Sequence, residues 1–178
     1  MINKPKVLIS SPGAGVFIRQ SALAYYEHNM LADFATTYVG NKPSILNSII
    51  HKIPFIKSQL HLRNIDDIDL NIIHTFPYRE LIRTFSSKML NPKMTDKIWE
   101  WAEIAFDKWV ANNFLNDVDI VHCYEHASLS TLQEANKKGV FSIYEQPSVH
   151  HTFFREQIVV PLLSKNPLFK KQYEDILN

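Results

Sequence analysis

The start of this chain constrains its fold more than any other part of the sequence. A short apolar run at residues 6–11 ("KVLISS") is followed at once by Pro-Gly-Ala-Gly, which stops a strand. Residues 16–28 then have helical spacing of apolar side chains, and residues 31–40 form a second apolar run that ends at Gly40. This β-α-β order predicts two parallel strands joined by a right-handed crossover.

The same alternation resumes after residue 68 and continues to residue 145. It predicts an α/β fold with a Rossmann-like, doubly wound and mostly parallel sheet. Beyond the first unit, the expected strands are residues 69–76, 117–124 and 140–145, and the expected helices are residues 77–90, 95–115 and 127–139. A short helix is also expected within residues 44–53, and two helical pieces within residues 150–178.

Residue spacing further predicts which side chains face the core. The helix at 95–115, with Thr95 as its N-cap, should bury the stripe Ile98, Trp101, Ala102, Ala105, Trp109 and Val110. The first helix should turn Val16, Leu23, Ala24 and either Tyr25 or Tyr26 inward. Two polar residues belong to strands. His122 is expected to be a hydrogen-bonded core histidine, and Glu145 is expected to be a buried strand-end carboxylate, with a catalytic role as the alternative.

Composition excludes several classes of function. A content of 46% hydrophobic residues can fill a core, and a net charge of +1 gives no global argument for nucleic acid. Cys123 is the single cysteine, so internal disulfides and multi-cysteine zinc sites are excluded. Among the eight histidines, His150 and His151 are adjacent, and neighbouring residues on a strand or helix point in different directions, so no shared metal is expected. The absence of a signal peptide and of a long apolar run predicts a cytoplasmic protein.

Three polar loops are expected at the carboxyl edge of the sheet, where ligands of open parallel sheets bind. Residues 11–15 follow the first strand and contain Gly13 and Gly15. Glu125, His126 and Ser128 follow the strand at 117–124, and the last strand runs into Gln146, His150 and His151. A histidine in such a place can bind sugar hydroxyls or exchange protons near neutral pH, or simply cap local structure, and both readings stay open for His126 and His150.

The glycine loop does not match a dinucleotide-binding fingerprint. Gly13 and Gly15 open the pattern G-x-G-x-x-G, but Ile18 takes the place of the third glycine. The second strand ends in Val39-Gly40 instead of the acidic residue that would hold a ribose. The loop can still bring backbone N–H groups close to a ligand at a helix start, or be a plain strand-to-helix turn.

Charge is distributed unevenly along the chain. Residues 42–98 contain nine Lys/Arg and five Asp/Glu, whereas residues 99–135 contain one Lys/Arg and seven Asp/Glu. Residues 49–63 mix basic and apolar side chains, so this segment could rest on an anionic membrane or receive a lipid-bearing acceptor. The alternative is an ordinary loop-helix excursion that covers the sheet. A segment 49–63 that rests on an anionic membrane would place the protein at the inner face of that membrane.

The segments "KVLISSPGAGVF" (6–17) and "DIVHCYEHASLSTLQEANKKGVFSIYEQPSVHHTFF" (119–154) resemble the N-terminal domain of retaining glycosyltransferases with the GT-B fold, in particular the large family numbered four. The resemblance implies an acceptor-side domain, one half of a GT-B architecture, that spans residues 1–178. It also implies that the C-terminal domain, which binds the nucleotide-sugar donor, is absent from this chain.

The resemblance assigns expected roles. Gly13 and Gly15 would shape the acceptor-side cleft, and His126 and His150 are the candidate catalytic residues. Glu125, Ser128, Gln146 and His151 would contact the substrate, a glycan or a lipid-linked acceptor. No cofactor is implied beyond the nucleotide-sugar donor of the complete enzyme. The isolated domain should be inactive; the alternative is a stand-alone Rossmann-like binding module that works with a separate partner chain.

Overall fold

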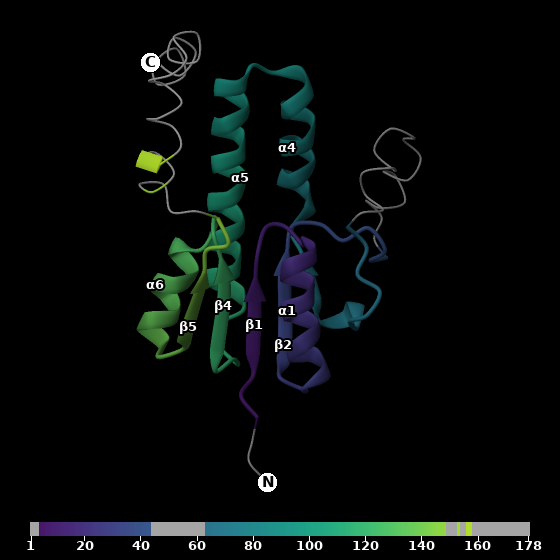
Figure 1. Cartoon of the computed structure of the whole chain (residues 1–178), viewed down its shortest axis with the longest axis vertical. Helices are drawn as coiled ribbons and strands as arrows, with labels where there is room; N and C mark the ends of the chain where they lie inside the picture. The colour runs from purple at the N-terminus through teal and green to yellow at the C-terminus, as the bar shows by residue number, and fades with distance from the viewer. Residues whose placement is uncertain (1–3, 44–62, 149–152, 154–155, 158–178) are drawn as a thin grey trace. The chain divides into compact units, whose positions relative to one another are not determined.

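The computed structural model of the chain describes residues 4–43, 63–148, 153, 156 and 157. They contain a five-stranded, all-parallel sheet with the order β3-β2-β1-β4-β5 (Figure 1). This order and direction confirm the predicted α/β, Rossmann-like fold. The strands are β1 (Val7–Ser10), β2 (Leu31–Thr36), β3 (Ile73–Thr75), β4 (Ile120–Tyr124) and β5 (Phe141–Glu145).

Helices cover both faces of this sheet. They are α1 (Val16–Glu27), the 3-10 turn η2 (Leu70–Ile72), α4 (Pro77–Met89), α5 (Pro92–Asn113) and α6 (Leu129–Lys138). Because neighbouring strand residues point to opposite faces, Val7 and Ile9 pack with α1, whereas Leu8 packs with α5 and α6. Two apolar layers therefore sandwich the sheet, and both are centred on β1.

The helix predicted at 95–115 begins earlier than its sequence pattern indicated. Its N-cap is Asn91, whose Oδ1 accepts a hydrogen bond from Met94 N at 2.9 Å, and Pro92 occupies the first turn. Proline is well suited to that position because the N–H it lacks would have no helical partner there. The prediction that Thr95 caps the helix is therefore wrong.

The apolar stripe of α5 was predicted only in part. Ala102 and Val110 are buried as expected, but Trp101 is 44% exposed and lies under the guanidinium of Arg79, 3.9 Å from the ring centroid. The strongest core contribution comes instead from Phe106, which is fully buried. Burying α5 through Phe106 turns the opposite face of the helix, with Trp101, toward solvent.

Two further elements differ in detail from the predictions. In α1, Ala22 is buried and Leu23 and Tyr25 are half-buried, whereas Ala24 is exposed and Val16 is 66% exposed, so the prediction that these last two face the core is wrong. The expected strand at 69–76 is extended only over Ile73–Thr75. Its start is a 3-10 turn because the Asp69 carboxylate accepts a hydrogen bond from the backbone N–H of Asn71 at 2.9 Å, which favours a turn over an extended chain.

The chain divides into two compact units, residues 1–145 and residues 146–178, and all the elements above belong to the first. The helices expected within 44–53 and 150–178 lie outside the described residues. So does the candidate membrane segment 49–63, apart from Arg63. No helix among the described residues is long and apolar enough to cross a membrane.

Candidate functional site at the carboxyl edge of the sheet

The strand order places a topological switch point between β1 and β4. The chain leaves β1 toward β2 and β3 on one side, and β4 is followed by β5 on the other. Ser10, the last residue of β1, is in register with Cys123 near the end of β4. The loop at 11–15 and the loop at 125–128 therefore start from neighbouring strands at the same edge, where a crevice for ligands is expected in this class of fold.

The glycine loop after β1 is firmly held and open on its outer side. Ser11 N donates a hydrogen bond to Ala35 O at 3.1 Å, and the Thr37 hydroxyl donates another to Pro12 O. Gly13 and Gly15 are exposed, and a Cβ atom built on either would meet no atom within 4 Å. Gly15 is the N-cap of α1 with φ −63°, a value open to any residue. Neither backbone strain nor packing therefore demands glycine at position 15.

The residues that end three of the strands carry buried hydroxyl groups. The hydroxyl oxygens of Ser10 on β1 and Thr36 on β2 have no hydrogen-bond partner in the described part of the chain, and Tyr124 ends β4. Burial raises the pKa of Tyr124, and Ser21 and Glu145 lie close enough to contribute to its shift. By strand alternation, the side chain of Ser10 lies on the α5 side of the sheet and those of Thr36 and Tyr124 lie on the α1 side, so these hydroxyl groups do not form one site.

His126 lies in the loop after β4 in an unusual backbone conformation. Its φ is 67° and that of Ala127 is 47°, both in the left-handed region that residues with side chains seldom adopt. The side chain is 66% exposed, and its Nδ1 lies 3.9 Å from Glu103 Oε2. A cavity of about 270 Å³ opens beside it, lined among others by Glu100, Glu103, Ile104, Ser128 and Leu129. The structure thus places His126 and Ser128 at the same cavity as the Glu103 carboxylate, which the sequence analysis did not predict.

The N-terminus of α6 beside this cavity is already occupied by a protein carboxylate. Asp107 of α5 is buried, and its Oδ2 and Oδ1 accept hydrogen bonds from Ser130 N at 2.6 Å and Thr131 N at 2.9 Å. Ser128, the N-cap residue, makes no side-chain cap hydrogen bond of its own. Because Asp107 neutralises this helix end, α6 is poorly suited to hold a second anion.

A hydrogen-bonded chain of three side chains lies on the α1 side of β4. His122 Nε2 is 3.0 Å from Glu145 Oε2, and His122 Nδ1 is 3.3 Å from the hydroxyl of Tyr25. The imidazole also stacks on Tyr124, with ring centroids 4.7 Å apart. A carboxylate only accepts, so neutral His122 carries its proton on Nε2 and accepts from Tyr25. The expectation that His122 is a hydrogen-bonded core histidine is confirmed, whereas the Glu145 side chain at the end of β5 is 36% exposed and not buried.

This network predicts a pH dependence of stability. Burial lowers the pKa of His122, an effect that the hydrogen bond and charge of Glu145 partly offset. The unfolded chain therefore binds this proton more readily than the folded one, so stability is lost as the pH falls below about 6.5. We expect the free energy of unfolding, measured with urea from pH 7 to pH 5, to fall more steeply in the wild type than in His122→Gln. Parallel curves would contradict this assignment.

Cys123 is not a nucleophile at this edge. It is fully buried, and burial together with the charge of Asp107 raises the pKa of its thiol to about 12. Almost no thiolate exists near neutral pH, and the thiolate is the reactive form. We expect the folded protein to resist alkylation by iodoacetamide at pH 8 and to react once unfolded in urea, as followed by mass spectrometry. Rapid labelling of the folded protein would contradict the buried placement.

The remaining candidate residues are spread over both units. The backbone N–H of Glu125 donates to Glu145 O at 2.9 Å, which ties the ends of β4 and β5 together. Gln146 is exposed and belongs to the second unit. His150 and His151 lie outside the described residues. Within the described ranges, no group of three His, Cys, Asp or Glu side chains is arranged to hold a metal ion.

Taken together, the fold and this edge define a Rossmann-like α/β domain with a candidate ligand site at its switch point. Comparisons with protein-family models, with curated proteins and with solved structures gave no significant match.

Proposed function

We propose that the chain is the acceptor-binding domain of a retaining glycosyltransferase of the GT-B type, similar to family four. One observation carries this proposal. The two segments that resemble the family, at 6–17 and 119–154, supply the neighbouring strands β1 and β4 and the loops on either side of the switch point. This placement puts the two resembling segments at the sheet edge where an acceptor-binding domain of this kind would hold its ligand.

The side chains at this edge support acceptor binding more than donor activation. The open glycine loop and the exposed imidazole of His126 offer hydrogen-bonding groups next to unfilled space. Transfer of a sugar also requires stabilisation of the departing diphosphate. The α6 N-terminus is occupied by Asp107, so we expect that stabilisation to come from a separate donor-binding domain. The partners would then be a glycan or lipid-linked acceptor and that domain.

Binding and turnover can be tested separately on the 178-residue chain. We expect short oligosaccharides to shift the backbone NMR signals of residues 13–15 and 125–128, without transfer from any nucleotide sugar. Gly15→Val should fold normally, because its φ is permitted and the space beside it is open, and should weaken glycan binding about tenfold or more. Gln133→Ala, an exposed substitution on α6, is the matched control.

Several outcomes would contradict the proposal. Measurable transfer by the isolated chain would show that it is not merely an acceptor domain. Glycan binding that is unchanged in Gly15→Val would remove the glycine loop from the site. Comparison of His126→Ala with His150→Ala decides which histidine faces the sugar, and unchanged affinity in both would exclude the histidines from the site.

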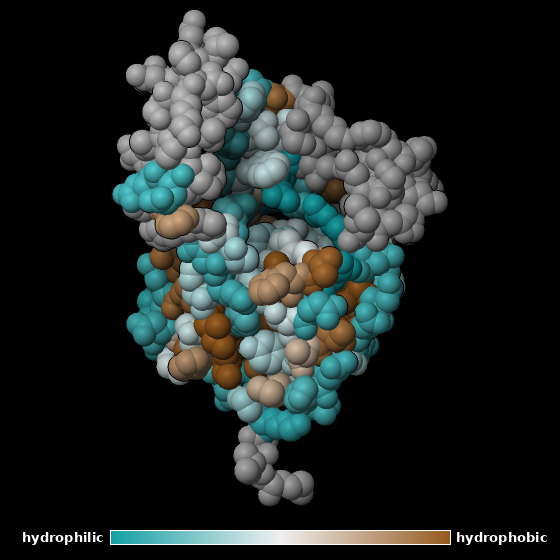
Figure 2. Space-filling model, viewed as in Figure 1, coloured by the Kyte–Doolittle hydropathy of each residue, from teal (hydrophilic) through white to brown (hydrophobic). Residues whose placement is uncertain are grey.

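A stand-alone binding module that works with a separate partner chain is the second candidate. It is favoured by the apolar side chain of Phe141 on β5, which is 66% exposed, whereas Tyr144, 49% exposed, lies on the opposite face of the strand. Figure 2 shows hydrophobic surface over β4 and β5, beside α1. Patches of this kind often mark protein contacts. Self-association of the purified chain at micromolar concentration would support this candidate if Phe141→Asp abolished it. A chain that stays monomeric at every concentration would count against this candidate.

A further inference from the structure

The helical hairpin formed by α4 and α5 extends beyond the carboxyl edge of the sheet (Figure 1). The Thr95 hydroxyl of α5 donates a hydrogen bond to Ser86 O of α4 at 3.3 Å and so joins the two helices. None of the residues from Pro92 to Trp101 is buried, whereas Ala102 and Phe106 are in the core. The first ten residues of α5, roughly 15 Å of helix, therefore lie outside the hydrophobic core of the domain.

This hairpin exposes large apolar side chains. Trp99 and Trp101 are 39% and 44% exposed. Four further large side chains of the two helices and their connection are exposed as well, namely those of Tyr78, Ile82, Leu90 and Met94. Apolar side chains that gather on one part of a protein surface often mark the place where a partner covers them. The hairpin is therefore a candidate contact site.

The two tryptophans lie on opposite flanks of α5, because two residues correspond to about 200° around a helix. A guanidinium from α4 lies over each ring. That of Arg83 is 4.6 Å from the ring centroid of Trp99, and that of Arg79 is 3.9 Å from the ring centroid of Trp101. A protein partner typically covers one face of a helix pair, whereas a membrane interface surrounds an inserted hairpin on all sides. Tryptophan rings favour that interface, and arginines beside them can pair with lipid phosphates.

The charge of the hairpin changes along its length. Residues 77–99 contain five Lys/Arg and two Asp/Glu, and one of these two acids, Glu80, is buried. The next turns of α5 carry Glu100, Glu103 and Asp107 instead. Basic residues are attracted to anionic lipid headgroups, and carboxylates are repelled by them. This distribution favours an approach to an anionic membrane with the end of the hairpin first.

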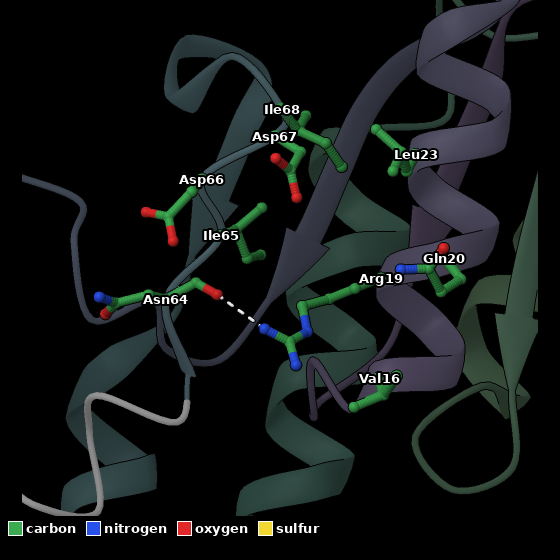
Figure 3. A pocket seen from close by; sticks show the side chains of 9 residues that line it. All are labelled: Val16, Arg19, Gln20, Leu23, Asn64, Ile65, Asp66, Asp67 and Ile68. Atoms are coloured by element: carbon green, nitrogen blue, oxygen red, sulfur yellow. Dashed lines mark hydrogen bonds between the residues drawn. The ribbon is translucent and has the colours of Figure 1, made fainter.

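The surface beside α1 has the opposite character. Asp66 and Asp67 are exposed and line a pocket between α1 and the segment that precedes β3. Arg19 is the single basic residue among those that line this pocket, and its Nη1 donates a hydrogen bond to Asn64 O at 2.9 Å (Figure 3). This side of the domain is therefore unsuited to lie on anionic lipid.

We propose that the end of the α4–α5 hairpin docks on the surface of an anionic lipid bilayer, with Trp99 and Trp101 at the depth of the headgroups and Lys93 and Lys97 beside lipid phosphates. The proposal uses neither the loops at the switch point nor the resemblance to glycosyltransferases, so its outcome does not depend on the proposed function. It also places the membrane contact on a different part of the chain from the segment at 49–63.

Co-sedimentation of the full chain with lipid vesicles tests this contact. At about 0.1 M NaCl, vesicles of phosphatidylcholine with about 30% phosphatidylglycerol should bind the chain at least about tenfold more tightly than vesicles of phosphatidylcholine alone. Raising the salt to about 0.5 M should remove most of this difference, because salt screens the attraction. Equal binding to both kinds of vesicle, or binding to neither, would overturn the proposal.

Charge substitutions locate the contact on the hairpin. Lys93→Gln combined with Lys97→Gln should weaken binding to the anionic vesicles about tenfold or more, because two basic residues are lost at the surface. Lys108→Gln combined with Lys137→Gln is the matched control, since both lysines are exposed and lie outside residues 77–99. This control should bind like the wild type. Equal weakening in both double variants would show a general charge effect and would contradict the proposal.

Apolar substitutions test the second part of the contact. Met94→Ser combined with Trp101→Ser should also weaken binding about tenfold, because less apolar area enters the interface. Phe141→Ser is the control, at an exposed apolar position on β5. If the loss in the double variant were no larger than the loss in this control, the apolar side chains of the hairpin would have no part in the contact and the proposal would be wrong.

Tryptophan fluorescence shows which part of the chain reaches the lipid. Lipids with brominated acyl chains should quench the wild type but not the double variant Trp99→Phe, Trp101→Phe, which should still bind. The remaining Trp109 is stacked on Phe76, with ring centroids 5.2 Å apart, and lies away from the end of the hairpin. Unchanged quenching in this double variant would overturn the proposal.

The segment at 49–63 is the competing site for a membrane contact, and it is tested in the same assay. Lys52→Gln combined with Lys57→Gln should reduce vesicle binding less than Lys93→Gln combined with Lys97→Gln. The reverse order would assign the contact to residues 49–63 and would exclude the hairpin.

Discussion

Replacement of Asp107 by alanine is expected to lower the free energy of unfolding by about 3 kcal/mol, because it removes a buried carboxylate with three hydrogen bonds. Its Oδ1 accepts from the Thr131 hydroxyl at 2.7 Å in addition to Thr131 N, and its Oδ2 accepts from Ser130 N. Without this carboxylate, the first N–H groups of α6 lose their partners, and the contact between α5 and α6 loses its polar link.

The size of this effect can be checked by thermal and urea unfolding. For a chain of this length, a loss of 3 kcal/mol corresponds to a fall in Tm of roughly 6–12 °C. Asp96→Ala, an exposed acidic position on the same helix, is the matched control and should change stability by less than about 0.5 kcal/mol. Thr131→Val keeps the backbone hydrogen bond and removes the hydroxyl, so it should cost about 1 kcal/mol. An equal, small effect of all three substitutions would show that Asp107 does not hold α6.

The consequence for function is specific. α6 follows directly on the loop that contains His126 and Ser128, so loss of the Asp107 hydrogen bonds should loosen that loop before it unfolds the sheet. If so, the Asp107→Ala substitution will increase the rate of hydrogen exchange more at residues 128–132 than in β1 or β4, relative to the wild type. A uniform increase over the whole sheet would indicate global destabilisation instead.

The fold was predictable because its signals are local. The apolar run of β1, the Pro-Gly stop after it and Gly139 at the end of α6 each specify one boundary, and Gly139 is found at φ 72° as a C-cap requires. Where another local signal was overlooked, as at Asn91-Pro92 before α5, the prediction was displaced by a few residues.

The candidate site was predictable only in position. A strand end in a parallel sheet places the loop at 125–128 at the binding edge, so His126 could be named from sequence. Its neighbour Glu103 and the cap Asp107 could not, because they look like ordinary polar positions on α5 and meet the loop only through helix packing.

Glu80 is the second position where a large loss of stability is expected. Its side chain is 4% exposed, and its Oε1 accepts from Arg63 Nη1 at 2.6 Å. Both of its oxygens also accept from Arg83, one from Nη2 and the other from Nε, each at 2.8 Å. Removal of the carboxylate leaves two guanidinium groups close together without their shared anion, and breaking such pairs is costly because the remaining charges stay partly desolvated.

We expect Glu80→Ala to lower the free energy of unfolding by about 2–3 kcal/mol, below the range for fully buried pairs because both arginines retain some contact with water. Glu80→Gln should cost less, since its amide oxygen still accepts one guanidinium. Glu134→Ala, which removes an exposed pairing with Lys137 on α6, should stay within about 0.5 kcal/mol.

A double-mutant cycle of Glu80→Ala with Arg63→Ala tests the cause of this loss. If the carboxylate stabilises the fold by pairing with Arg63, the two losses will add to more than the loss in the double variant, because the second substitution removes a charge that the first has left unpaired. Additive losses would mean that Glu80 does not stabilise the fold through Arg63. Urea unfolding of the wild type, the two single variants and the double variant decides between these results.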